Sequence, residues 1–259
     1  MNGLKSKNSN QIIGKFINYI ILPVIILVIW QICYVFGFLK PYSMPTVKAV
    51  LVAAWEGIKD FTIFNDILVS FIRVLVGFFI SAVLAITLGI FIGISKKVES
   101  FTDIIIKLLK PIPPIAWIPL AILWFGIGEG SKIFIIAIGA FFPILINVVD
   151  GIKNIDKKYL ELSKVYEIPR RKVISKIILP GALPSIMTGI RIGLGNAWVC
   201  VVAAEMIAAT TGVGYMIMDA RSLSRPDVVI VGMLIIGIVG KLMDDVIIAI
   251  SKKVVKGRG

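Results

Sequence analysis

Long apolar runs with few or no charged residues dominate this chain. The run from Phe16 to Leu39 contains no charged residue, and further apolar runs recur along the 259 residues. About 20 such residues are enough to cross the hydrocarbon core of a bilayer as a helix. With 58% hydrophobic residues and a mean hydropathy of +0.97, the chain has more apolar surface than a soluble core can bury. We therefore expect an all-α polytopic membrane protein.

Six apolar segments are predicted to span the membrane as helices, at about 16–39, 67–95, 112–127, 132–149, 185–208 and 228–248. The first is too long for the apolar core of a cleaved signal peptide and lacks a small-residue cleavage site, so we expect it to be retained. On this interpretation, residues 1–259 form a single transmembrane domain, and residues 153–184 form one long cytoplasmic loop.

The net charge of +13 is distributed in a way that predicts membrane orientation. Basic residues gather at the N-terminus, in Lys96–Lys110, in Lys153–Lys176 and in the tail from Lys252. These segments alternate with poorly basic loops, as the excess of Lys and Arg in cytoplasmic loops requires. We expect a multi-pass protein of the cell (plasma or inner) membrane with both termini in the cytoplasm. Nucleic acid is not needed to explain the charge.

Several classes of chemistry are excluded by residues that the sequence lacks. Histidine is absent, which removes Ser-His-Asp catalysis and histidine-based zinc or haem sites. Cys33 and Cys200 are isolated inside apolar segments, so neither a disulfide nor a metal pair is indicated. No Gly-x-x-x-x-Gly-Lys-Ser/Thr loop occurs, so nucleotide hydrolysis must be done by another chain. We expect no enzyme activity, no metal and no cofactor bound by this chain.

Three ionisable residues inside predicted spans are candidates for the pathway or for intramembrane pairing: Arg73, Arg191 and Glu205. Arg191 and Glu205 are fourteen residues apart, about 21 Å along a helix axis, and cannot pair with each other. Candidate partners of Glu205 are Arg73 and Arg221. Glu205 either holds the structure together by pairing or capping, or lines a pathway, because an ionisable group at membrane depth needs a partner or water.

Local patterns predict further packing features. Small residues recur every fourth position in the second span, which lets another helix approach closely, either within one subunit or at a dimer seam. Because a four-residue step drifts on a helix with 3.6 residues per turn, only about two turns of this ridge should face one neighbour. Residues 46–60 form an amphipathic pattern, at the outer membrane interface or against outer loops. Prolines crowd the entry to the third span. The ridge residues are Gly77, Ser81, Ala85, Gly89 and Gly93, and the prolines are Pro111, Pro113, Pro114 and Pro119.

The charged segment ELSKVYEIPRRKVISKIILP, Glu161 to Pro180, lies between two apolar runs. Its spacing resembles the cytoplasmic loop of ABC importer permeases, Glu-Ala-Ala, three residues, Gly, nine residues, Ile-x-Leu-Pro. Glu161, Ile177, Leu179 and Pro180 match this pattern, whereas Glu167 replaces the Gly. Glycine at such a position supplies a left-handed residue, which costs Glu roughly 1 to 2 kcal/mol. Because Pro169 offers another way to break the helix, we expect the turn to persist with an altered shape.

The stretches Pro111–Ile152 and Thr188–Met206 are similar to permeases of the nitrate, sulfonate, taurine and bicarbonate group of ABC importers. The resemblance implies a type I ABC importer permease fold, a cytoplasmic ATPase subunit that carries ATP and Mg, an extracytoplasmic binding protein and a second permease copy, with lipid around them. It implies that the loop docks on the ATPase and that Tyr215 lies near the docked binding protein. The implied coupling residues are Glu161, Glu167, Pro169, Arg170, Arg171, Ile177, Leu179 and Pro180.

The predicted function is the membrane-spanning permease subunit of an ATP-driven importer of a small solute. The solute is a sulfonate-, nitrate- or taurine-like anion or a vitamin precursor. The alternative is an ion-coupled secondary transporter, which would favour several carboxylates or a histidine relay at mid-membrane. Glu205 is the only carboxylate in a predicted span away from the span ends, which favours the importer.

Overall fold

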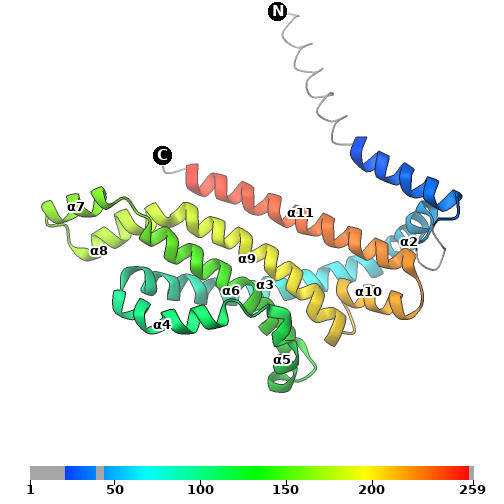
Figure 1. Cartoon of the computed structure of the whole chain (residues 1–259), viewed down its shortest axis with the longest axis horizontal. Coiled ribbons are helices and arrows are strands. Elements are labelled where there is room, and N and C mark those ends of the chain that lie inside the picture. Colours follow the sequence, from blue (N-terminus) through cyan, green and yellow to red (C-terminus); the bar gives the residue numbers. More distant parts are fainter. Residues whose placement is uncertain (1–20, 39–43, 257–259) are drawn as a thin grey trace, which may run out of the picture.

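The computed structural model describes residues 21–38 and 44–256, and within these ranges the chain is helical and contains no strand. The long helices run along the long axis of the molecule, with the α7–α8 hairpin at one end and α2 and α10 at the other (Figure 1). The helices are α2 (Val47–Lys59), α3 (Thr62–Ile94), α4 (Lys96–Leu109), α5 (Ile118–Phe125), α6 (Glu129–Lys153), α7 (Lys157–Val165), α8 (Arg170–Val173), α9 (Leu179–Ala208), α10 (Val213–Ser222) and α11 (Pro226–Lys256). Short 3-10 and π segments, η1 (Pro114–Trp117) and η2 (Ile174–Ile178), join some of them.

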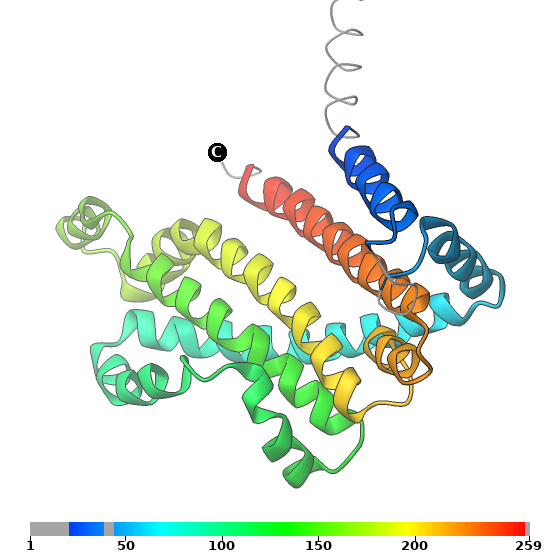
Figure 2. The same ribbon diagram turned by 45° about the vertical axis from the view of Figure 1, so that its right-hand side comes forward.

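The core is a layer of three helices in which α6 packs between α3 and α9. Figure 2 shows α6 beside α9 over most of its length. Glycines make this close approach possible: a Cβ at Gly193 of α9 would lie 2.7 Å from Ile144 of α6. The buried side chains are aliphatic and β-branched for the most part, and they interlock where the glycines leave room. The main core residues are Val74, Ala85, Ile92, Ile136, Ala140, Ile144, Leu145, Val148, Leu194, Ala197 and Val201.

The small-residue ridge of α3 faces α6 within the same chain. A Cβ at Gly77 would lie 2.7 Å from Ile136, and a Cβ at Gly93 would lie 2.8 Å from Ile152. The contact therefore persists over sixteen residues, and the expectation that only two turns would face one neighbour is wrong. Because a four-residue ridge drifts around a straight helix, the two helices must wind about each other to keep this contact.

The chain bends sharply at the entry to the segment predicted as the third span, 112–127. Helix α4 ends at Leu109, η1 begins at Pro114 and leads into α5, and α4 and the η1–α5 segment are bent by 88° to each other. A proline ring removes a backbone donor and clashes with a preceding helical carbonyl, so Pro111 and Pro113 explain the break. Pro114 and Pro119 lie in the first turns of η1 and α5, where proline is tolerated. One apolar side of α4 is exposed, at Phe101, Ile104, Ile105 and Leu108.

The amphipathic pattern at 46–60 forms α2, whose Val50 and Ala53 pack against Ile63 and Val231. Thr46 caps this helix, because its Oγ1 accepts a hydrogen bond from Ala49 N at 3.1 Å. Of the first predicted span, the structure describes an apolar helix from Ile21 to Val35. Residues 16–20 and 39, and the basic N-terminus, lie outside the described residues.

Three helical segments of the described chain are long and apolar enough to cross a membrane, and a fourth is added if the bent α4–α5 pair is one span. The three are α3, α6 and the continuous helical stretch Arg170–Ala208 of 39 residues. Helix α11 is 31 residues long but contains Lys241, Asp244 and Asp245. The count of six spans therefore stays a prediction.

Candidate functional site

The basic hairpin consists of α7, α8 and the turn between them, and it projects from one end of the helical layer (Figure 1). Asp156 caps α7, because its Oδ1 accepts a hydrogen bond from Lys158 N at 2.9 Å. Pro169 is the N-cap of α8. Capping at the start of α7 and a proline before α8 thus define two short helices from local sequence alone.

The turn between the two helices retains the left-handed residue even though no glycine is present. Glu167 has φ +48°, and Glu167 N donates to Lys164 O at 3.0 Å. Ile168 N reaches back to Ser163 O at 2.9 Å. These two bonds are the pair that closes a helix in the Schellman motif. The turn therefore keeps the left-handed geometry, and Glu167 carries the strain that glycine would avoid.

The predicted coupling residues divide into two groups. Glu161, Glu167, Pro169, Arg170 and Arg171 are exposed on the hairpin. Ile177, Leu179 and Pro180 are half-buried at its base, where η2 passes into α9. A π-helical turn such as η2 is uncommon and often occurs at functional positions.

An exposed apolar strip on the hairpin was not predicted from the sequence. Tyr159, Leu162, Val165 and Tyr166 are exposed, the last two by 76% and 75%. Their spacing of three and four residues places them on one side of α7. The spacing is visible in the sequence, but it does not tell whether such a strip is buried or exposed. We call these four residues the hairpin strip.

A cavity of about 570 Å³ lies behind the hairpin, between the start of α7 and the η2–α9 junction. Its lining is Asn154, Ile155, Asp156, Tyr159, Lys176, Ile177, Pro180 and Gly181. The cavity leaves the first turn of α7 loosely packed against the rest of the molecule.

Replacement of Glu167 by glycine is expected to stabilise the turn by about 1 kcal/mol, because the left-handed strain disappears. Hydrogen exchange at the Ile168 amide, which bonds Ser163 O, should slow about fivefold. The Glu167→Ala variant is the control, since alanine carries the same strain and should not slow exchange. Equal exchange in the two variants would contradict a strained turn.

At the opposite end of the molecule, Arg73 of α3 lies at the centre of an ion cluster in which Arg73, Glu205 and Lys132 are buried and Glu129 is 56% exposed. Arg73 Nη1 donates to Glu205 Oε1 of α9 at 2.8 Å, and Arg73 Nε donates to Glu129 Oε2 of α6 at 2.7 Å. Lys132 Nζ lies 2.8 Å from Glu129 Oε1. The side chains of Arg73 and Glu205 are 7% and 0% exposed. The cluster joins α3, α6 and α9.

Glu205 also fixes the loop that leads into α10. Gly214 N donates to Glu205 Oε2 at 3.0 Å, Val213 N to Ser70 Oγ at 3.0 Å and Gly212 N to Asp66 Oδ1 at 2.8 Å. Carboxylates at a helix N-terminus satisfy free N–H groups and oppose the positive end of the dipole. Gly212 has φ +112°, and a Cβ there would lie 2.4 Å from Glu205 Oε1. Side chains of α3 and α9 therefore cap α10. Arg221, the other candidate partner of Glu205, lies exposed in α10.

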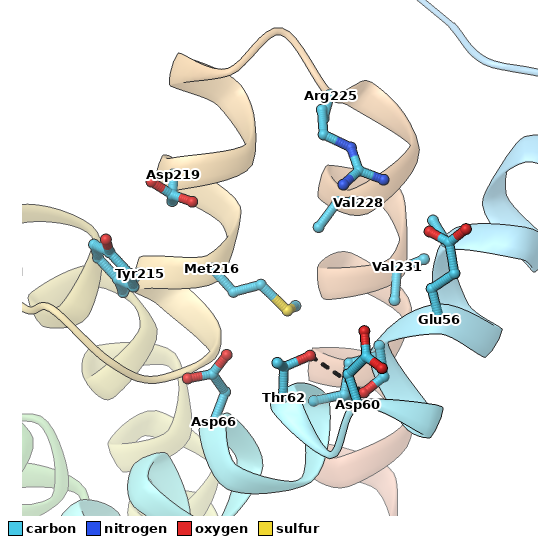
Figure 3. Close-up of a pocket in the computed structure, with 13 residues that line it drawn as sticks. Glu56, Asp60, Thr62, Asp66, Tyr215, Met216, Asp219, Arg225, Val228 and Val231 are labelled. Carbon is cyan, nitrogen blue, oxygen red and sulfur yellow. Dashed lines mark hydrogen bonds between the residues drawn. The ribbon is translucent and has the colours of Figure 1, made fainter.

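Tyr215 lies beside a cavity of about 300 Å³ between α2, α3, α10 and α11. Figure 3 shows Tyr215, Asp219 and Arg225 around it, together with acidic side chains from α2 and α3. The charged groups are Glu56, Asp60, Asp66, Asp219 and Arg225.

Arg191 forms a fork with Asp244 that joins α9 to α11. Arg191 Nε donates to Asp244 Oδ1 at 2.6 Å and Arg191 Nη2 to Asp244 Oδ2 at 2.8 Å. Lys241 is paired with Asp245 one turn along α11. The structure thus keeps Arg191 and Glu205 in separate groups, as their spacing requires.

Comparison with known proteins identifies relatives over most of the chain. The profile of the family described as binding-protein-dependent transport system inner membrane component matches residues 85–255. A putative ABC transporter permease protein of Methanocaldococcus jannaschii is 44% identical and covers 86% of this chain and 85% of its own length. A putative aliphatic sulfonates transport permease protein of Bacillus subtilis is 41% identical over 92% of this chain and 87% of its own length. Other relatives, 34% and 40% identical, are named as taurine and nitrate transport permeases.

The fold has a counterpart among solved structures. A chain of the MetNI methionine ABC transporter in an inward-facing crystal form is similar with a TM-score of 0.58. The match covers 73% of this chain and 97% of that chain at 16% identity. The all-helical arrangement described above is therefore that of a type I ABC importer permease.

Proposed function

We propose a role for each part of this chain, which belongs to the family of binding-protein-dependent transport system inner membrane components. It is thus the permease subunit of an ATP-driven importer rather than an enzyme. The basic hairpin docks on a cytoplasmic ATPase subunit that binds ATP and Mg. An extracytoplasmic binding protein delivers the solute at the end formed by α2 and α10. Two copies of the chain form the pathway, residues 1–259 act as one domain, and both termini lie in the cytoplasm.

The observation that carries the docking proposal is the hairpin strip. Tyr159, Leu162, Val165 and Tyr166 expose apolar area on the same hairpin that exposes Arg170 and Arg171, a part of the chain outside the apolar helices. Exposed apolar side chains with a charged rim are typical of a protein interface. A matching partner would have an apolar groove for the hairpin strip and acidic groups that pair with the two arginines.

A force applied to the hairpin would pass directly along α9 to the other membrane helices. Arg170–Ala208 is one continuous helical stretch, so α8 and the outer end of α9 move together. At that outer end Glu205 is bonded to Arg73, which links α9 to α3 and α6. Closure of two ATPases would thus tilt these helices as a unit between inward-open and outward-open states. Arg73 and Glu205 serve to hold the moving helices together.

The proposed solute is a small oxyanion. Relatives are named as permeases for aliphatic sulfonates, taurine and nitrate, and each of these solutes contains a compact oxyanion group. A permease of this kind accepts what its binding protein delivers. Tyr215 and the cavity beside it are the proposed contact area for that protein, because α10, which carries Tyr215, lies at the end of the molecule away from the hairpin (Figure 1).

Binding of the ATPase tests the docking proposal. At low salt the Arg170→Ala/Arg171→Ala variant is expected to retain at most about a tenth of the ATPase in co-purification, because it lacks two cations that pair across the interface. Raised salt should weaken binding by the parent and narrow this difference, because exposed ion pairs are screened. The Lys252→Ala/Lys253→Ala variant removes two exposed cations from the end of α11 and should bind as the parent does. Equal retention by all three proteins would show that the arginines meet lipid headgroups instead. Uptake by the chain without any ATPase would favour a secondary transporter.

A further inference from the structure

Helix α2 turns two of its sides toward the rest of the chain. Val50 and Ala53 are buried in a cluster with residues of α3 and α11. On the adjacent side, Glu56 and Asp60 line the cavity of about 300 Å³ between α2, α3, α10 and α11. These contacts fix the rotation of α2 about its own axis, so the direction of its remaining side is set as well.

The remaining side of α2 is apolar and exposed. At 100° per residue, Leu51, Trp55 and Ile58 fall within an arc of about 60° around the helix, and no charged residue of α2 lies in that arc. The three residues are 66%, 69% and 57% exposed in the described part of the chain. We call Leu51, Trp55 and Ile58 the apolar side of α2.

Two exposed lysines border this apolar side. Lys48 and Lys59 lie about 20° to 40° beyond Trp55 around the helix, and Val52 lies at the border between these lysines and Glu56. The order around α2 is therefore apolar, basic and then acidic. A helix that lies in the interface of a bilayer has this order, because its apolar side enters the acyl chains and its lysines reach up to the phosphates. The acidic groups then stay in water.

The apolar side continues into a groove between α2, α3 and α11. This groove of about 400 Å³ is lined by Ile58 of α2, Phe64 of α3 and Ile238 of α11, among other apolar residues. Phe61, which also lines it, connects α2 to α3 with φ +58° and is 72% exposed. One turn after Phe64, Leu68 is exposed on α3, a helix long and apolar enough to cross a membrane. The apolar side of α2 is therefore continuous with a surface that meets lipid.

We propose that α2 binds phospholipid of the outer leaflet. Acyl chains contact the apolar side and occupy the groove, and Lys48 and Lys59 meet the phosphates. The choice of leaflet rests on the proposed cytoplasmic position of the hairpin, because α2 lies at the opposite end of the molecule (Figure 1). Lipid contact holds α2 in the plane of the membrane surface, so Glu56 and Asp60 face water at the place proposed for the binding protein.

Spin labels on single cysteines test the lipid contact. Cys33 and Cys200 are replaced by alanine, a cysteine replaces each residue of the apolar side in turn, and Glu56→Cys and Asp60→Cys are the controls on the same helix. Each full-length variant is shown to elute like the parent in gel filtration and is reconstituted into phospholipid vesicles. Collisions with oxygen, which enters acyl chains, and with a polar nickel chelate, which stays in water, are measured by electron paramagnetic resonance.

Labels on the apolar side should collide with the nickel chelate at least about fivefold less often than labels at the two controls, because polar solutes are excluded from hydrocarbon. Their collisions with oxygen should be more frequent than at the controls. Frequent nickel collisions at all five positions would place the apolar side in water and overturn the proposal. Rare collisions with both reagents on the apolar side would show that protein, such as a second copy, covers it, and would overturn the proposal too.

A separate measurement tests the leaflet. A membrane-impermeant maleimide should label Glu56→Cys in sealed, right-side-out membrane vesicles. Labelling only after the vesicles are opened would overturn the assignment to the outer leaflet, and it would also contradict the proposed cytoplasmic position of the hairpin. The collision results do not depend on that position, so a failure of the lipid contact and a failure of the proposed orientation are distinguishable.

Discussion

Uptake by the Glu161→Lys variant is expected to fall at least about tenfold, while membrane insertion is unaffected. Glu161 is exposed on α7, away from the packed helices, so the change leaves the transmembrane core intact. In the docked state it would place a cation where the ATPase groove receives a carboxylate, and a like or unpaired charge at an interface costs several kcal/mol. ATP hydrolysis by the assembled complex should continue without driving transport.

Two controls separate docking from local helix stability. A lysine at this position would stand one turn from Lys157, Lys158 and Lys164, and such like-charge pairs weaken a helix by a few tenths of a kcal/mol each. Glu161→Gln removes the carboxylate without adding that repulsion and should lose less uptake. Asp103→Lys makes the same charge reversal on α4, where it breaks one exposed ion pair, and should transport normally. Normal uptake by Glu161→Lys would contradict its role in coupling.

The Arg73→Met variant is expected to lose roughly 3 kcal/mol or more of folding stability, because Glu205 would remain buried without its cation. The side chains of the pair are 7% and 0% exposed, so water cannot replace Arg73. Melting of the purified complex should begin roughly 5 to 10 °C lower. The measurement is thermal unfolding of parent, single and double variants in the same detergent.

A double-mutant cycle identifies the pair as the cause. Combining Arg73→Met with Glu205→Gln should recover part of the loss, because a neutral amide still accepts hydrogen bonds from Ser70 and Gly214. Arg191→Met is the matched control: it breaks a fork that is half exposed, and should cost less than about 1 kcal/mol. An unchanged melting temperature for Arg73→Met would show that the buried cluster does not hold the helices together.

The family, the helical fold and the transport function were predictable from the sequence, and the comparisons confirm them. Long apolar runs predict membrane helices without knowledge of any contact. The small-residue ridge indicated close helix packing, within one subunit or at a dimer seam, and the structure places it within one chain. A period on one helix cannot tell how its neighbour winds around it. The extent of the contact between Gly77 and Gly93 was therefore underestimated.

The ion cluster could be predicted only as a set of candidates. Glu129 and Glu205 lie 56 and 132 residues after Arg73 in the sequence, and no local pattern joins the three residues. From the sequence alone, Glu205 had two candidate partners, and Glu129 was not predicted to take part in the cluster. The prolines predict that the chain bends between α4 and α5, but the angle of the bend depends on packing. The coupling and pathway roles of the named residues stay predictions.

The π-helical turn η2 has a consequence for the direction in which the hairpin points. A π turn holds one more residue than an α turn, so it shifts the angular phase of everything before it relative to α9. One residue corresponds to about 100° of rotation around the helix axis. The five residues Ile174–Ile178 therefore set which side of the membrane helices the hairpin strip and the two arginines look toward. A partner that binds this hairpin must match the direction in which the hairpin points around the axis of α9, as well as the surface of the hairpin.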